Sequence, residues 1–217
     1  MKPLDQCLLY GFVDTAYLRN RRPSLFARQL CEGGADLIQL RAKTSTPQEI
    51  ERMAKEILPV TRDAGVRLVI NDHLDVAVEV GADFCHLGQE DFFDGGYTHV
   101  DEVRPAGSNI GIGLSTHTPA QAERAVQAGA DYVAIGPVYA TATKPTAKPV
   151  TLGYVRWAAE EVQIPWFAIG GINFETLDAV LEAGATRVCI VSAILGAEDV
   201  TQVCRRFKVR LQESLKS

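Results

Sequence analysis

A short stretch past the middle of the chain combines residue types that bind anions. It runs from Gly136 to Lys144, with the sequence Gly-Pro-Val-Tyr-Ala-Thr-Ala-Thr-Lys, directly after the apolar run 132–135. Thr141 and Thr143 can donate hydrogen bonds through hydroxyl and backbone N–H groups, and Lys144 carries a compact charge that suits phosphate. Because Thr and Lys are also common in surface loops, this stretch alone leaves both a phosphate site and a solvated loop open.

A second basic group follows the apolar run 37–40. Residues 39–43 are Gln-Leu-Arg-Ala-Lys, and the alternation of side chains along a strand turns Gln39, Arg41 and Lys43 to one side. An inward-facing set with two cations would need an anion to offset its charge. The pattern therefore favours anion binding over a solvated basic turn.

Acidic residues follow two further apolar runs. Asn71 and Asp72 end one of them, and Glu90 and Asp91 lie just beyond the next. Two carboxylates with an amide and a nearby glutamate suit a hard, oxygen-liganded ion such as Mg²⁺, completed by water and substrate phosphate. Taken alone, Asp72 could instead cap a helix that begins at Leu74. The cations nearby favour the metal, and metal with cations indicates a pyrophosphate site.

Three other segments add small polar groups. In the segment 113–117, Gly-Leu-Ser-Thr-His, we expect Ser115 to be a hydrogen-bond donor and regard His117 as a weaker candidate for a base. The segments 169–172, Ile-Gly-Gly-Ile, and 191–194, Val-Ser-Ala-Ile, suit a second phosphate, because a glycine-rich turn and a helix start bring backbone N–H groups close to a ligand. The sequence thus predicts two anion sites, one with a metal and one without.

A repeat in the sequence indicates how these segments are brought together. Four similar pentapeptides, at 32–36, 79–83, 127–131 and 182–186, each close a helical pattern and open an apolar run. Their glycine suits a helix C-cap, since the left-handed conformation costs glycine nothing, and the following alanine or its equivalent packs where a helix meets a sheet. Successive repeats are about two βα units apart, so four of them predict eight strands.

Eight apolar runs fall on that grid and are the predicted strands: 8–13, 37–40, 67–70, 84–87, 109–113, 132–135, 166–169 and 187–191. Amphipathic helical stretches are clearest at 47–64, 119–127 and 174–183. Thr46-Pro47 and Thr118-Pro119 predict N-caps followed by proline at the first helical position. Continuously apolar strands are typical of parallel sheets covered on both faces. The prediction is a single α/β domain over residues 1–217, a (β/α)8 TIM barrel, whose chemistry lies in the loops after the strands.

Composition excludes several classes of protein. A hydrophobic fraction of 47% with 23% charged residues is typical of a globular protein, and no segment has the apolar length of a membrane span. A net charge of −5 argues against a nucleic-acid binder. The N-terminus lacks the apolar core of a signal peptide, so we expect a cytoplasmic protein with free cysteines. The oligomeric state is left open, with a homodimer as one option.

Seven motifs in this order resemble the thiamine-phosphate synthase (thiamine-phosphate pyrophosphorylase) family, and the resemblance covers nearly the whole chain. The motifs lie at 39–43, 71–72, 86–91, 113–117, 136–144, 169–172 and 191–194. The resemblance implies a (β/α)8 barrel that joins 4-amino-2-methyl-5-hydroxymethylpyrimidine diphosphate to thiazole phosphate, giving thiamine phosphate and pyrophosphate with the help of Mg²⁺.

The resemblance also implies a role for each matched residue. Asp72 and Asp91 would hold Mg²⁺. The pyrimidine diphosphate would be held by Gln39, Arg41, Lys43, Asn71, Ser115 and Lys144. The thiazole phosphate would be held by Thr141, Thr143, Gly171, Val191 and Ser192. The same comparison places Leu40, Ala42 and Ala142 among the substrate-binding residues, and Arg41, Lys43, Ser115 and Lys144 among the catalytic ones.

The mechanism that fits is dissociative, because the cations and the metal stabilise the departing diphosphate and no side-chain nucleophile is required. The loop 137–149 is the candidate lid. The close rival is a thiazole tautomerase of the same superfamily, which has a histidine directly after the glycine that ends strand 6, where this chain has Pro137. Two alternatives are more distant: another phosphate-binding barrel isomerase, and a catalytically silent member of the superfamily that only binds thiamine precursors.

Overall fold

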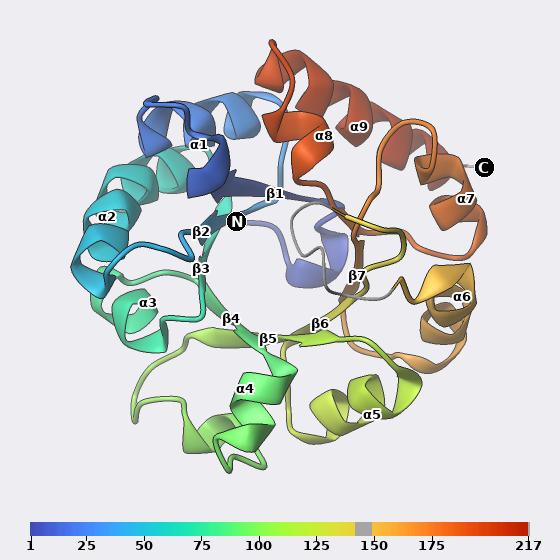
Figure 1. Ribbon diagram of the computed structural model, residues 1–217, viewed down its shortest axis with the longest axis horizontal. Coiled ribbons are helices and arrows are strands. Elements are labelled where there is room, and N and C mark those ends of the chain that lie inside the picture. Colours follow the sequence, from blue (N-terminus) through green and yellow to red (C-terminus); the bar gives the residue numbers. More distant parts are fainter. Residues whose placement is uncertain (142–148, 217) are drawn as a thin grey trace.

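The computed structural model describes residues 1–141 and 149–216, and in this part of the chain eight parallel strands close into a barrel (Figure 1). Their order around the barrel is their order in the sequence, as predicted. The strands are β1 (Leu9–Asp14), β2 (Leu37–Arg41), β3 (Arg67–Asn71), β4 (Phe84–Gly88), β5 (Gly111–Thr116), β6 (Tyr132–Ile135), β7 (Trp166–Ile169) and β8 (Val188–Cys189).

Helices surround the barrel on the outside (Figure 1). The α-helices are α1 (Pro23–Glu32), α2 (Pro47–Asp63), α3 (Leu74–Val80), α4 (Gln89–Asp94), α5 (Pro119–Gln127), α6 (Thr151–Glu161), α7 (Leu177–Glu182), α8 (Ser192–Leu195) and α9 (Val200–Ser214). Short 3-10 helices lie at η1 (Leu4–Gln6), η2 (Thr15–Tyr17) and η3 (Val100–Glu102).

The predicted helix starts are confirmed where a cap was visible in the sequence. Thr46 accepts a hydrogen bond from the backbone of Glu49, whose carboxylate accepts one from Thr46 in return, which is a capping box. The Thr118 side chain caps α5 by accepting a hydrogen bond from the Gln121 N–H, without a capping box. The helix predicted from residue 174 begins later, at Leu177, because the Asn173 side chain accepts hydrogen bonds from two backbone N–H groups of the intervening turn.

Six strands differ from the predicted bounds, β1 to β4 by one residue at one or both ends and β5 and β8 by more. The strand predicted at 109–113 spans 111–116 instead, because the backbone of Ile110 is bound by the side chains of Ser108 and Arg104 before the ladder begins. The last strand is only two residues long, Val188–Cys189, after which the chain turns into α8. Polar residues expected beyond strand 5, Ser115 among them, are therefore part of the strand itself.

Aromatic rings fill the barrel interior, and glycines on β5 make room for them. A Cβ atom at Gly111 would lie 2.2 Å from the Phe84 ring, and one at Gly113 would lie 2.1 Å from the Tyr132 ring. The Tyr132 ring also meets Tyr10 and Phe167 edge-on, with centroids 6.0 and 5.7 Å away. This interlocked packing fixes the floor on which any ligand at the carboxyl ends of the strands must rest.

The repeated pentapeptide has two structural roles. Its glycines, Gly34, Gly81, Gly129 and Gly184, all have left-handed backbone conformations at helix ends, which confirms the predicted caps. Three of the four pentapeptides end in aspartate, and these aspartates bind the starts of β1, β3 and β5. Asp36 accepts hydrogen bonds from the backbone of β1, Asp83 from β3 and Asp131 from β5.

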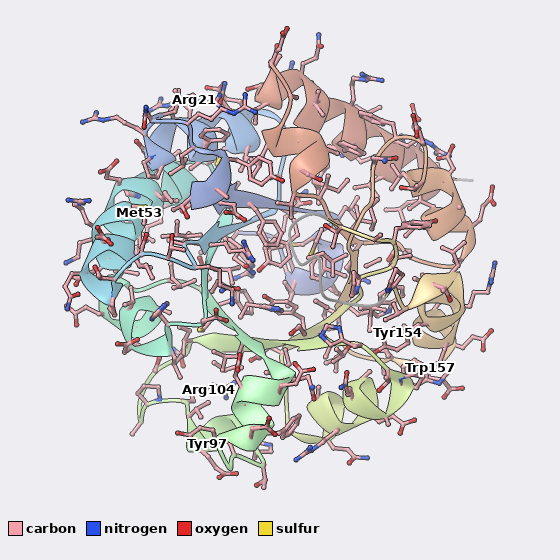
Figure 2. All side chains as sticks on the ribbon, viewed as in Figure 1. Arg21, Met53, Tyr97, Arg104, Tyr154 and Trp157 are labelled. Atoms are coloured by element: carbon pink, nitrogen blue, oxygen red, sulfur yellow. The ribbon has the colours of Figure 1, made fainter. Side chains whose placement is uncertain are left out.

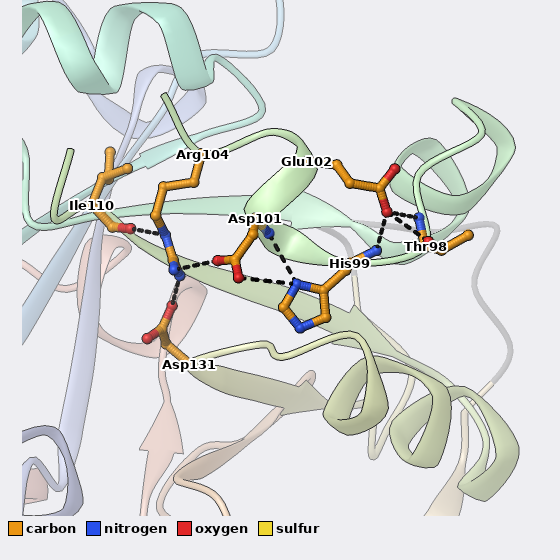
Figure 3. Close-up of polar contacts among 7 residues, drawn as sticks. All are labelled: Thr98, His99, Asp101, Glu102, Arg104, Ile110 and Asp131. Atoms are coloured by element: carbon orange, nitrogen blue, oxygen red, sulfur yellow. Dashed lines mark hydrogen bonds and ion pairs between the residues drawn. The ribbon is translucent and has the colours of Figure 1, made fainter. Parts of the chain in front are cut away.

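Each of these aspartates also has a basic partner. Figure 3 shows Arg104, which donates to Asp131 and Asp101 and to the Ile110 carbonyl, and so ties the connection between α4 and β5 to the barrel. Next to it, His99 begins η3 and is held by the Glu102 carboxylate. Arg67 lies 3.7 Å from Asp83, and Asp36 pairs with Lys2 and Lys208.

Outer helices are anchored by aromatic and polar contacts. Figure 2 shows Tyr154 and Trp157 together on α6, where their rings stack with centroids 5.7 Å apart. The Tyr154 hydroxyl lies 2.8 Å from both Thr116 Oγ1 and the Thr118 carbonyl, which fastens α6 to the end of β5. All five cysteines are free thiols, as expected. In the described residues no helix is long and apolar enough to span a lipid bilayer.

Candidate active site

A pocket of about 240 Å³ lies at the carboxyl ends of the strands and draws residues from every strand or the loop after it. Most residues predicted from the sequence line it: Gln39, Arg41, Lys43, Asn71, Asp72, Asp91, Ser115, Thr141, Gly171, Val191 and Ser192. Strand register explains this convergence, since Asn71 pairs with His86 and Gly88 pairs with Ser115 across neighbouring strands. The chemistry-bearing ends of β2 to β5 therefore form one continuous rim.

The residues predicted to project from β2 to one side do so, but the protein itself supplies counter-charges for its two cations. Arg41 donates to the buried carboxylate of Asp14 on β1 at 2.7 Å, and Lys43 donates to Asp72 at 2.5 Å. The two cations therefore need no bound anion to offset their charge in the protein by itself, and anion binding by this group stays a prediction. Among the described residues Gln39 has no charged partner; its amide nitrogen lies 2.6 Å from the buried Tyr10 hydroxyl in the barrel interior.

Two carboxylates predicted to bind metal, Asp72 and Asp91, both line the pocket. Asp72 does not cap α3, whose N-cap is His73 without a side-chain bond. It has a left-handed backbone conformation, with φ of 64°, and its N–H donates to the His86 carbonyl at 2.9 Å. Asp91 lies in the first turn of α4 rather than at a strand end.

Gly88 provides the space that the Asp91 carboxylate occupies. A Cβ atom at position 88 would lie 2.5 Å from Asp91 Oδ2, closer than any real contact. The residue before α4 must be glycine for this carboxylate to keep its place, which is the kind of cradle that a metal ligand needs. Within residues 1–141 and 149–216 no group of three or more His, Cys, Asp or Glu side chains could hold an ion by itself.

Charge balance decides what the rim can bind. The described residues that line the pocket include the cations Arg41 and Lys43 and the carboxylates Asp72, Glu90 and Asp91. A diphosphate placed among these side chains would meet more negative than positive charge. A divalent cation held by these carboxylates would reverse that balance, and Mg²⁺ suits such a site because it binds through few protein ligands.

A chain of buried hydroxyl groups forms the pocket floor. It runs from Gln39 to the Tyr10 hydroxyl, on to the Tyr132 hydroxyl at 3.0 Å, and then to His86 Nδ1 at 3.0 Å. Burial raises the pKa of both tyrosines well above the usual value, so both stay protonated. The sequence suggested neither tyrosine as a site residue, because each lies inside an apolar run.

The opposite rim, at the ends of β6 and β7, is built from tightly packed backbone. The N–H of Val138 donates to the Ile169 carbonyl at 2.8 Å, and the N–H of Tyr139 donates to the Gly170 carbonyl at 3.0 Å. A Cβ atom at Gly170 or Gly171 would lie 2.4 or 2.7 Å from atoms of this segment. Only glycines allow the two loops to approach so closely.

Beyond β8, Val191 and Ser192 line the same side of the pocket as Gly171 and Thr141. Ser192 is the first residue of α8. The first N–H groups of a helix have no partner within it and can bind an anion, although in α8 the Ile194 N–H already donates to the Val191 carbonyl at 3.1 Å. The glycine turn and this helix start thus give the second rim the predicted character of a phosphate site.

His117 links the two rims. Its Nδ1 donates to the carbonyl of Gly136, since a carbonyl only accepts, and its Nε2 lies 3.8 Å from a Glu90 carboxylate oxygen. Its backbone N–H also donates to the Gln121 side chain at 2.7 Å. His117 thus connects the stem of the loop after β6 with the start of α4.

Some predicted residues are not gathered in the pocket. The side chains of Leu40 and Ala42 are buried in the core on the other face of β2 and do not line it, as the alternation along the strand requires. Ala142, Thr143 and Lys144 lie outside the described residues, as does most of the candidate lid. Phe12 on β1 lines the pocket but was missed, although it alternates with Tyr10 and Asp14 on the inward face.

The chain is similar to known proteins over nearly its whole length. A family model described as thiamine monophosphate synthase matches residues 9–194. A thiamine-phosphate synthase from Halalkalibacterium halodurans is 38% identical over 207 residues, which cover 94% of this chain and 95% of that protein. One from Thermus thermophilus is 43% identical over 180 residues, covering 82% and 84%. The solved structure of a thiamine phosphate pyrophosphorylase from Pyrococcus furiosus superposes with a TM-score of 0.85 at 31% identity, covering 98% of both chains. The matched region includes every strand that lines the pocket.

Proposed function

The chain belongs to the thiamine monophosphate synthase family, and from that premise we propose how its pocket carries out the reaction. As a transferase of this family it joins the aminopyrimidine diphosphate to thiazole phosphate and releases pyrophosphate. The observation that carries the proposal is the division of one pocket into a charged rim on β2 to β5 and a backbone rim on β6 to β8.

The charged rim is the proposed site of the pyrimidine diphosphate. Arg41, Lys43 and Asn71 line the pocket on this rim, and Ser115 on β5 lines it as well. Lys43 pairs with Asp72 while no ligand is bound, and both side chains are partly exposed, so this ion pair contributes little free energy and exchanges easily. We expect Lys43 to move from Asp72 to the diphosphate when substrate binds.

Asp72 and Asp91 are the proposed Mg²⁺ ligands, since the excess of carboxylates on this rim fits a divalent cation and the space over Gly88 keeps Asp91 in place. Bound there with the diphosphate, Mg²⁺ would supply positive charge to the oxygens that become more negative as the diphosphate leaves. The protein contributes the fixed carboxylates and the flanking cations.

The backbone rim is the proposed site of the thiazole phosphate. Gly171 and Ser192 offer backbone N–H groups, and Thr141 adds a hydroxyl from the loop after β6. Thr143 would add a second hydroxyl by the family resemblance. Apolar side chains between the rims, such as Ile169 and Val191, would exclude water from the reacting atoms.

The chemical step then requires no enzyme nucleophile. The bond between the pyrimidine methylene carbon and the diphosphate oxygen breaks, and its electron pair leaves with the diphosphate. The thiazole nitrogen donates its lone pair to the same carbon, so one C–O bond is replaced by one C–N bond without proton transfer. Arg41, Lys43 and Lys144 would stabilise the leaving group, and Ser115 would donate a hydrogen bond to it.

The tautomerase alternative is disfavoured by the position after Gly136. That position is Pro137, which lines the pocket but has no acid or base group. Every polar position needed for the transferase within the described residues is filled, whereas the general acid or base of the rival is missing.

The proposal is tested by incubating purified protein with both substrates and measuring thiamine phosphate and pyrophosphate together. Equal amounts of the two products, dependent on each substrate and abolished by a Mg²⁺ chelator, are expected. Conversion of a thiazole precursor alone, or pyrophosphate release that a chelator leaves unchanged, would contradict the proposal.

A further inference from the structure

Four side chains from four different strands form one unbroken hydrogen-bonded path across the pocket floor. The path joins Gln39 on β2, Tyr10 on β1, Tyr132 on β6 and His86 on β4, with donor–acceptor distances of 2.6, 3.0 and 3.0 Å. Both ends of the path, Gln39 and His86, line the pocket, as does Tyr10, whereas Tyr132 does not; the two tyrosines are at most 1% exposed. We call this path the tyrosine relay.

The relay has a direction because each hydroxyl has one proton to donate. The amide nitrogen of Gln39 only donates, so the Tyr10 oxygen accepts from it. Because a buried hydroxyl proton needs an acceptor, we infer that Tyr10 donates to Tyr132 and that Tyr132 donates to His86 Nδ1. Since Nδ1 must accept, the neutral imidazole carries its proton on Nε2.

The two ends of the relay are therefore coupled. With this direction, Gln39 retains its carbonyl oxygen as an acceptor, and His86 has an N–H donor on a ring that lines the pocket. Reversing any one hydrogen bond requires reversing all of them, together with the amide orientation of Gln39. Such coupled buried networks specify one arrangement more strongly than separate pairs do.

We propose that Tyr10 and Tyr132 are positioning residues that set the hydrogen-bonding polarity of Gln39 and His86 for an aminopyrimidine edge. An aminopyrimidine presents an amino donor and a ring-nitrogen acceptor, which match one acceptor and one donor on the protein. This inference rests on the proposed function, because it assigns the pyrimidine ring to this side of the pocket.

The surrounding packing fixes the two tyrosine rings, and with them the positions of their hydroxyls. Gly113 on β5 leaves the space in which the Tyr132 ring lies, and that ring stacks on His86 at 5.6 Å between centroids. Tyr10 is fixed by Phe12 and by Phe167 at 5.2 and 5.3 Å. Phenylalanine would satisfy all of these ring contacts, so the packing does not by itself require the two hydroxyls.

The first measurement reads the tautomer directly. The chain has four histidines, and ¹⁵N-labelled protein allows the His86 ring nitrogens to be identified by their loss in His86→Gln. In ligand-free wild-type protein we expect an unprotonated Nδ1 and a protonated Nε2. In Tyr132→Phe, Nδ1 loses its donor, so we expect the two nitrogen shifts to move toward each other. A protonated Nδ1 in the wild type, or an unchanged spectrum in Tyr132→Phe, would overturn the proposal.

The second measurement separates binding of the two substrates. Tyr10→Phe and Tyr132→Phe each break the same relay, so each should raise KM for the pyrimidine diphosphate about tenfold, as expected for one lost hydrogen bond. The double variant should be no worse than the poorer single variant, because a path can be broken only once. KM for thiazole phosphate should not change. Additive losses, or equal changes in both KM values, would contradict the relay.

Tyr154→Phe is the matched control, since it also removes a buried tyrosine hydroxyl with two partners, but on α6 away from the pocket lining. It should reduce stability while leaving the His86 spectrum and the pyrimidine KM unchanged. If Tyr132→Phe does not fold, Tyr10→Phe tests the same path from its other end. Failure of the wild-type protein to make thiamine phosphate would reject the proposed function, whereas the ligand-free spectrum tests the relay independently.

Discussion

Substitution of Gly88 by alanine should weaken metal binding without disturbing the fold. Gly88 has φ of −65° and ψ of 130°, a conformation that alanine adopts without strain. Its added Cβ would meet only Asp91, at 2.5 Å from Oδ2 and 3.3 Å from Cγ. Since ordinary contacts begin near 3.4 Å, the carboxylate must move by about 1 Å. Misplacement of about 1 Å in a catalytic group costs on the order of 10²-fold.

The expected result is a rise of about 10²-fold in the Mg²⁺ concentration that gives half-maximal rate, with little change in KM for thiazole phosphate. Mn²⁺ binding followed by electron paramagnetic resonance should weaken in parallel, which measures the ion without relying on turnover. Gly153→Ala on α6 is the matched control, because its nearest neighbour would be 3.6 Å away. The control should keep the wild-type Mg²⁺ requirement.

A double variant makes the test specific to Asp91. If Gly88→Ala acts by displacing that carboxylate, adding Asp91→Ala should cause little further loss of metal affinity. Full additivity of the two substitutions, or an unchanged Mg²⁺ requirement in Gly88→Ala, would refute the reasoning.

Substitutions at three other places in the molecule should have separable effects on stability, turnover and substrate binding. Asp36→Asn should lower Tm at pH 7 by roughly 10 °C, because it leaves Lys208 buried without a counter-charge. Burial opposes ionisation of Asp36, but hydrogen bonds from its lysine partners hold its pKa below the usual value. In thermal melts the difference in Tm between wild type and variant should therefore be full at pH 7 and shrink as the pH falls below about 4. Lys144→Ala should reduce turnover by about 10²-fold, more than it weakens pyrimidine diphosphate binding. If single-turnover kinetics show an unchanged rate of the chemical step, Lys144 contributes only to binding. Replacing Thr141 and Thr143 by valine should raise KM for thiazole phosphate far more than for the pyrimidine substrate, and equal effects would remove the distinction between the two rims.

Much of the fold was predictable because its signals are local in the sequence. Apolar runs, proline after a threonine cap and glycine at helix ends each depend on a few neighbouring residues, and the β6 and β7 boundaries were predicted to the residue. The short β8 was not, since its apolar run continues past the point where the chain leaves the sheet. Strand ends depend on pairing with a neighbour, which the run itself does not contain.

The site was predictable to the same extent and for the same reason. Polar residues at strand ends indicate the rim of a barrel, and the same rule applied to the first strand would have identified Asp14. The counter-charges of Arg41 and Lys43 come from other strands, and so were not visible from residues 39–43. Tyr10 and Tyr132 resembled core residues, because only the closed barrel brings their hydroxyls together.

Charged residues at the two ends of the barrel have different roles, one set in stability and the other in binding. At the amino ends of the strands, Asp36, Asp83 and Asp131 bind the backbone of β1, β3 and β5 and pair with cations, and none of them lines the pocket. At the carboxyl ends, the partly exposed carboxylate of Asp72 has a lysine partner that can exchange for substrate. Because the first set of charges is satisfied internally, the barrel is held closed by contacts that substrate does not disturb. The carboxyl-end rim can therefore hold an unbalanced group of carboxylates, which is the property that a metal-dependent diphosphate site requires.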